Sequence, residues 1–98
     1  MRDLQILDEV KSTLALLTAK APGRAIEVRV PPYAAVQCGD GPTHTRGTPP
    51  NTIEMSADTW LALASGKLSW SDAMSSGAIA ASGVRADLTE YLPLGSEA

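Results

Sequence analysis

The sequence predicts an α+β domain in which a small, mostly antiparallel sheet is covered on one face by short helices. Three observations indicate this class. Residues 2–20 repeat leucine and valine at helical spacing, residues 25–30 alternate apolar and charged side chains as a half-buried strand does, and residues 56–77 hold two short capped helices. Because the chain has 98 residues, we expect a single domain, 1–98, with one core.

The N-terminal segment, 1–22, is predicted to be a helix, followed by sheet and helices at 24–94 and a tail at 95–98. Ala21-Pro22-Gly23 is the composition that ends a helix. One face of this helix is apolar and the opposite face is charged. The apolar face is formed by Leu4, Leu7, Val10, Leu14 and Leu17.

The first strand is predicted at 25–30, since Ile26, Val28 and Val30 alternate with charged residues. A partner strand is expected at 33–38, after two prolines. Turn residues follow at 39–42, and 43–46 and 51–55 are further short runs that can form strands. Together these segments predict an antiparallel sheet with one face in water.

Two helix starts and two helix ends are marked by local residues. Ser56 and Ser69 are favourable N-cap residues, and Gly66 and Gly77 are suited to the left-handed conformation that follows a helix. Ala73, between the second pair, is expected to pack closely on the sheet.

The last part of the chain is predicted to return to the sheet. Residues 78–82 are a short strand that Gly83 closes. Residues 84–94 then form one or two helical turns that end before Pro93.

Gly66-Lys67, Ala73, Gly77 and Gly83 occur in an order that resembles the sterol-carrier-protein superfamily. Together with "EVRVPPYAAVQC" and "HTRGTPPN", this stretch is similar to the compact sterol-carrier-family proteins of actinobacteria. The resemblance implies a small α/β lipid-transfer fold and a carrier role.

Between such a sheet and such helices, alanine and glycine occupy little volume and can leave an apolar cleft. The expected ligand is lipid-like, either a fatty acyl chain or a sterol-like molecule. The alternative is that the same residues simply form the core. The candidate lining is Val28, Val36, Trp60, Leu63, Leu68, Trp70, Met74 and Ile79.

Thiol chemistry requires a nucleophile, a base and a cation, and four residues close in sequence supply these types: Cys38, Asp40, His44 and Arg46. No helix N-terminus is predicted there to activate the thiol, so a buried strand cysteine is the favoured interpretation. A lone His and a lone Cys do not form a recognisable metal site. We therefore expect no catalysis, no metal and no cofactor.

The formal charge of −3, with scattered basic residues, argues against a nucleic-acid partner. A single cysteine and the lack of a long apolar run predict a cytoplasmic protein without membrane integration. The rival hypothesis is an interaction module. It would use the stiff loop from Arg46 to Asn51, with Pro49-Pro50 as an apolar platform, or share the first helix with a second chain as a homodimer.

Overall fold

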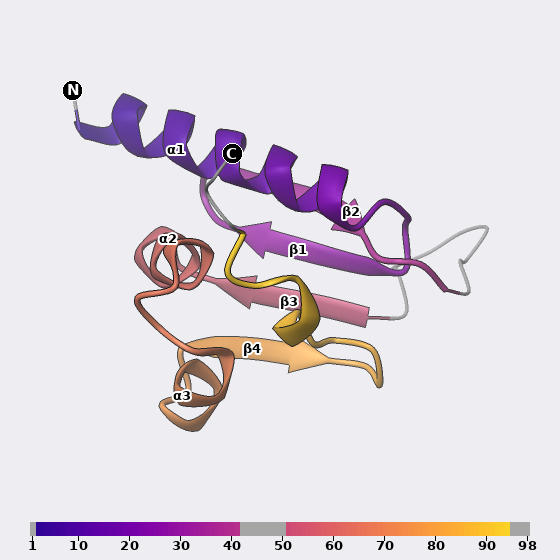
Figure 1. The fold of residues 1–98 in the computed structure, drawn as a ribbon. Coiled ribbons are helices and arrows are strands. Elements are labelled where there is room, and N and C mark those ends of the chain that lie inside the picture. Colours follow the sequence, from indigo (N-terminus) through magenta and orange to yellow (C-terminus); the bar gives the residue numbers. More distant parts are fainter. Residues whose placement is uncertain (1, 42–50, 95–98) are drawn as a thin grey trace.

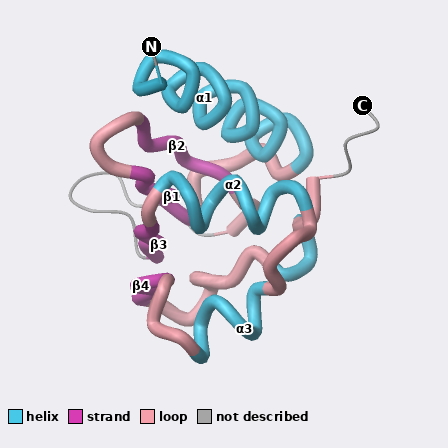
Figure 2. The backbone as a smooth tube through the Cα atoms, turned by 90° about the vertical axis from the view of Figure 1, so that its left-hand side faces the viewer, coloured by secondary structure: helices cyan, strands magenta, loops and turns pink. Residues whose placement is uncertain are grey.

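The computed structural model describes residues 2–41 and 51–94, and within them a four-stranded sheet has its helices on one face (Figures 1 and 2). The N-terminal helix and the two short helices were predicted within a residue or two of their bounds. The elements are α1 (Arg2–Lys20), β1 (Ile26–Val30), β2 (Ala34–Cys38), β3 (Asn51–Met55), α2 (Ala57–Ser65), α3 (Trp70–Ser75), β4 (Ile79–Ser82) and the 3-10 helix η1 (Thr89–Tyr91). The β-capable run at 43–46 and the loop at 46–50 lie outside the described residues.

The strand order is β2-β1-β3-β4, and two of the three strand pairs are antiparallel, as predicted. The central pair, β1 with β3, is parallel. The direction of the hairpin formed by β1 and β2 explains this parallel pairing. Cys38 ends β2 opposite Ile26, the first residue of β1, and Asn51 begins β3 opposite the same Ile26. A strand that starts at that end on the far side of β1 runs parallel to β1.

The two faces of β1 differ as the alternation predicts. Ile26, Val28 and Val30 are buried under the helices. Glu27 and Arg29 point to the opposite face, where the guanidinium Nε lies 2.8 Å from a Glu27 carboxylate oxygen. No described helix covers that face (Figure 2), so it remains in water.

Helix α1 packs against β2 and α2. Val10, Leu14 and Leu17 are buried, whereas Leu4 is 64% exposed. The predicted apolar face is therefore used from Val10 onward, and the first turns of α1 extend beyond the sheet (Figure 1).

The predicted caps of α2 and α3 are confirmed. The hydroxyl of Ser56 accepts the backbone N–H of Thr59 at 3.2 Å, and that of Ser69 accepts the N–H of Asp72 at 3.0 Å. Gly66 has φ of 85° after α2. Gly77 has φ of 80° after α3. Ala73, predicted to pack closely on the sheet, is fully buried in α3, which contacts β4.

The C-terminal segment, 84–94, crosses the helix-covered side and fixes its parts together. The Asn51 amide donates to the carbonyl of Ala25 at 2.8 Å and accepts the N–H of Arg85 at 2.9 Å. Leu88 is fully buried. The C-terminal segment has one helical turn, Thr89–Tyr91, which ends before Pro93, as predicted.

Candidate functional site

The eight residues predicted to line a cleft occupy three different environments. Val28, Trp60 and Leu63 are at most 1% exposed and Ile79 is 6% exposed, so these four belong to the core. Val36, Leu68 and Trp70 are half-buried and pack against that core. Met74 is 43% exposed on α3 and does not join the others.

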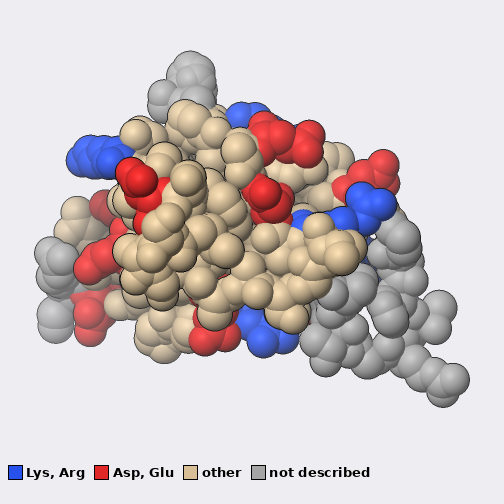
Figure 3. Space-filling view, turned by 90° about the horizontal axis from the view of Figure 1, so that it is seen from below, with Lys and Arg blue, Asp and Glu red and all other residues tan. Residues whose placement is uncertain are grey.

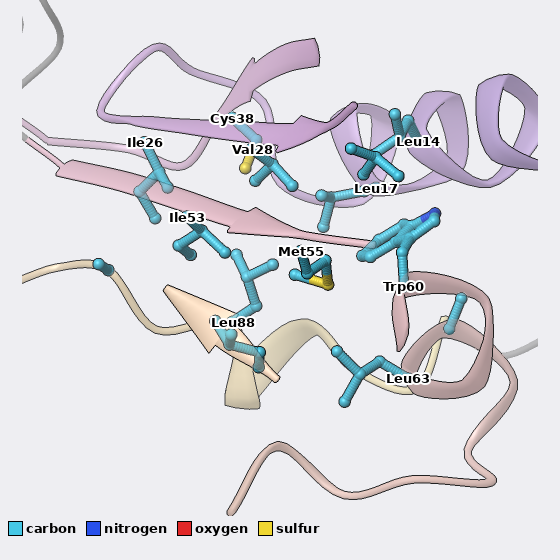
Figure 4. Close-up of a cluster of buried hydrophobic side chains, with 14 of the residues drawn as sticks. Leu14, Leu17, Ile26, Val28, Cys38, Ile53, Met55, Trp60, Leu63 and Leu88 are labelled. Carbon is cyan, nitrogen blue, oxygen red and sulfur yellow. The ribbon is translucent and has the colours of Figure 1, made fainter. Parts of the chain in front are cut away.

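The space between the sheet and the helices is filled by side chains (Figure 4). Ile53 and Met55 from β3 and Leu88 from the C-terminal segment meet Trp60 and Leu63 there, and all five are at most 4% exposed. Three pockets are present among the described residues, and none of these three is lined by any of the eight predicted residues. A ligand cleft formed by those eight residues therefore stays a prediction.

An apolar groove is open elsewhere, between α1 and α2. Its volume is about 520 Å³, within the range of small-molecule binding sites. Leu16, on α1, is 42% exposed there. The groove is lined by Asp8, Glu9, Ser12, Thr13 and Leu16 of α1, by Leu61, Ala64 and Ser65 of α2, and by Lys67 and Leu94. We call this site the α1–α2 groove.

A partly buried hydrogen bond holds the two helices of the α1–α2 groove at a fixed separation. The indole N–H of Trp60 donates to the Thr13 hydroxyl at 2.7 Å, and that hydroxyl donates to the carbonyl of Glu9 at 2.6 Å. Trp60 is fully buried, so its ring fixes the position of α2 against the core while its N–H fixes α2 to α1. The groove is therefore largely preformed.

The C-terminal segment supplies the third side of the groove. The N–H of Leu94 donates to the carbonyl of Ala64 at 3.0 Å, which attaches the segment to α2. The ammonium of Lys20 donates to the carbonyls of Tyr91 at 2.9 Å and Pro93 at 3.2 Å, which attaches it to the end of α1. Leu94 is thereby held against Ala64.

Most hydroxyl donors in the groove are already used by their own helices. Ser12 donates to the carbonyl of Asp8 at 2.8 Å, and Ser65 donates to that of Ala62 at 3.2 Å. Asp8 and Glu9 on one helix and Lys67 after the other are exposed charged residues of the lining. The site thus combines aliphatic side chains with a few charges and can accommodate an apolar molecule bearing one polar end.

Two smaller pockets have a different character. One, of about 340 Å³, lies beside the C-terminal segment and includes Asp40, Arg85, Asp87 and Glu90. The other, of about 390 Å³, lies on the water-facing side of the sheet and includes Glu27, Arg29 and Glu54. Charged side chains in both make them poor sites for an apolar ligand.

Cys38 is not an activated nucleophile. It is buried, and this burial raises the pKa of its thiol to about 11, so that the thiol is protonated at neutral pH. The interpretation as a buried strand cysteine is confirmed. His44 and Arg46, two other residues of the candidate thiol site, lie outside the described residues.

The raised pKa of Cys38 predicts a specific loss of stability in alkali. The unfolded chain loses the thiol proton above about pH 9 while the folded chain keeps it up to about pH 11. Between these values the unfolded state binds fewer protons, so the free energy of unfolding should fall by up to about 1.4 kcal/mol per pH unit from this group. Urea unfolding of wild type and Cys38→Ala across this range should show a steeper decline for wild type. Parallel curves would mean that the thiol does not titrate this way.

The residues of the α1–α2 groove were missed by the sequence interpretation. Leu16 lies off the regular stripe of Leu14 and Leu17, and Leu61 lies beside the buried Trp60. Such additional apolar residues at the margin of a stripe are a weak indication that a helix contacts more than the sheet. Leu94 carries no such indication, because its place depends on the path of the C-terminal segment.

Comparison with known protein families assigns the chain to one of them. A family model described as bacterial SCP ortholog matches residues 3–94, so the chain belongs to this sterol-carrier-protein family. No curated protein matches the chain. Among the described residues, no helix is long and apolar enough to cross a bilayer, and no cluster of His, Cys, Asp or Glu could hold a metal ion.

Proposed function

We propose that the protein is a non-catalytic carrier or binding protein for a lipid-like molecule, and that the α1–α2 groove holds this molecule. Membership of the bacterial sterol-carrier family supports a lipid-binding role. The observation that carries the proposed location is the groove itself, which is apolar, of suitable volume and open in the structure. On this proposal the protein acts in the cytoplasm and requires no cofactor.

The groove is favoured over the interior for an energetic reason. A ligand between the sheet and the helices would have to displace Leu88 or Trp60, both fully buried. Removing one such side chain from the core costs several kcal/mol. A ligand that binds with micromolar affinity would have to compensate for this loss of free energy through its own contacts. The α1–α2 groove requires no such displacement.

A fluorescent fatty acid should bind the wild-type protein with micromolar affinity, about −8 kcal/mol. Leu16→Trp should weaken binding at least tenfold, because the larger ring would occupy the groove. Met74→Trp is the matched control, since Met74 is exposed to 43% and Leu16 to 42%, and each variant adds one tryptophan. Binding is measured by probe fluorescence, with folding checked by circular dichroism.

The two variants separate the two locations. If Met74→Trp blocks binding and Leu16→Trp does not, the ligand lies near α3, and the α1–α2 groove is not the site. If wild type binds no fatty acid and no sterol probe, the carrier function fails and an interaction module becomes the favoured function.

A further inference from the structure

Lys67 is the one cationic residue among those that line the α1–α2 groove. It is exposed, and within residues 2–41 and 51–94 its ammonium forms no ion pair. The ammonium of Lys20, by contrast, already donates to two carbonyls of the C-terminal segment. The Lys67 ammonium therefore has donors available for a ligand that lies in the groove.

The end of α2 does not need this ammonium. A lysine near the last turn of a helix often donates to the carbonyls that the helix leaves without partners. Here backbone N–H groups take that role. The carbonyl of Ala62 accepts the N–H of Lys67 itself at 2.9 Å, and that of Ala64 accepts the N–H of Leu94 at 3.0 Å. The Lys67 side chain is thus not required as a cap.

The acidic residues of the lining lie toward the other end of the groove. The hydrogen bond between Trp60 and Thr13 joins the two helices between these ends. Asp8 and Glu9 precede Thr13 along α1, whereas Lys67 follows Trp60 along α2. Both helices run toward the C-terminal segment, which is hydrogen-bonded near the end of each (Figure 2). The groove therefore has a negative end and a positive end.

We propose that the α1–α2 groove selects a single aliphatic chain that carries one carboxylate, and that Lys67 binds this carboxylate. The proposal rests on the groove being the ligand site. The chain would lie over Leu16 and Leu61, and repulsion from Asp8 and Glu9 would keep the carboxylate away from the negative end. A free fatty acid has this structure, whereas a sterol lacks the charge. A phosphate monoester carries nearly two negative charges, which one ammonium does not balance.

A single ammonium, rather than a basic patch, is consistent with the charge distribution elsewhere. The chain has a formal net charge of −3. Figure 3 shows the face that carries α3 and β4, where basic side chains are scattered and not gathered into one patch. Such a surface provides no long-range attraction for anions. The preference for a carboxylate would therefore come from short-range contact inside the groove.

Calorimetric titration of the full chain with decanoate and with decanol tests the role of Lys67, because the two ligands share a chain and differ in charge. Lys67→Gln should weaken decanoate binding about fivefold, the upper range for an exposed ion pair, and should leave decanol binding unchanged. Lys11→Gln is the matched control, since Lys11 is an exposed lysine of α1 outside the lining. It should change neither affinity. Circular dichroism checks that each variant is folded.

Three results would overturn the proposal. Lys67→Gln could weaken both ligands by the same factor, which would assign to Lys67 only the packing of its aliphatic stem. It could change neither affinity. Wild type could bind decyl phosphate or decylamine more tightly than decanoate. If Leu16→Trp still blocks the ligands in these cases, the groove remains the ligand site and only the choice of head group is wrong. If wild type binds none of the four ligands, this proposal and the proposed carrier function both fail.

Discussion

Gly23→Ala is expected to destabilise the protein by about 3 kcal/mol or more. Gly23 has φ of 135°, which an alanine rarely adopts. A Cβ at this position would overlap the carbonyl of Gly39. That carbonyl accepts the N–H of Ala25 at 3.1 Å at the start of β1, so neither backbone can move away freely.

Gly77→Ala is the control, because it also replaces glycine by alanine but places the new Cβ in open space. Gly77 has φ of 80° but nothing lies within 4 Å of its Cβ position. We expect a loss of about 1 kcal/mol from backbone strain alone, with fatty-acid affinity unchanged. Urea unfolding measures both variants. Equal effects would show that the contact between Gly23 and Gly39 is not tight in solution.

Trp60→Ala is expected to cost about 3–5 kcal/mol, the usual range for removing a buried aromatic ring. Trp60 is the largest of the fully buried side chains. Its loss leaves a cavity between α2 and the sheet and removes the bond of 2.7 Å to Thr13. Because this bond also spaces α1 from α2, the folded fraction should bind the fatty acid less tightly as well.

Thr13→Val separates the packing of Trp60 from its hydrogen bond. It keeps the shape of the side chain but removes the acceptor of the indole N–H, which should cost about 1–3 kcal/mol. Thermal or urea unfolding compares the two variants. If Thr13→Val costs as much as Trp60→Ala, the hydrogen bond rather than the buried ring dominates at this position.

The helices and the first hairpin could be predicted because their causes are local. The caps at Ser56 and Ser69 and the alternation in β1 depend on residues close together in sequence, and both are present in the structure. The parallel pairing of β1 with β3 could not be predicted in this way. It depends on which side of β1 the chain places β3, and no local pattern specifies that.

The interior was predicted in composition but not in how it is filled. Trp60 and Leu63 were expected to face the sheet, and both are buried. The sequence did not indicate that Leu88 would join them, because the segment after β4 has weak periodicity and its path depends on distant contacts such as that of Asn51 with Arg85. The same segment supplies Leu94 to the α1–α2 groove, so the groove was hidden from sequence reasoning as well.

The most direct test of the α1–α2 groove as the ligand site is a ¹H-¹⁵N NMR titration of the labelled protein with a fatty acid. A fatty acid bound in the groove should cause saturable shifts of the amides of Leu16, Leu61, Ala64 and Leu94, while the amides of Val28 and Ile79 should not shift. Shifts confined to Val28, Ile79 and their neighbours in the sheet would place the ligand in the interior and contradict the account.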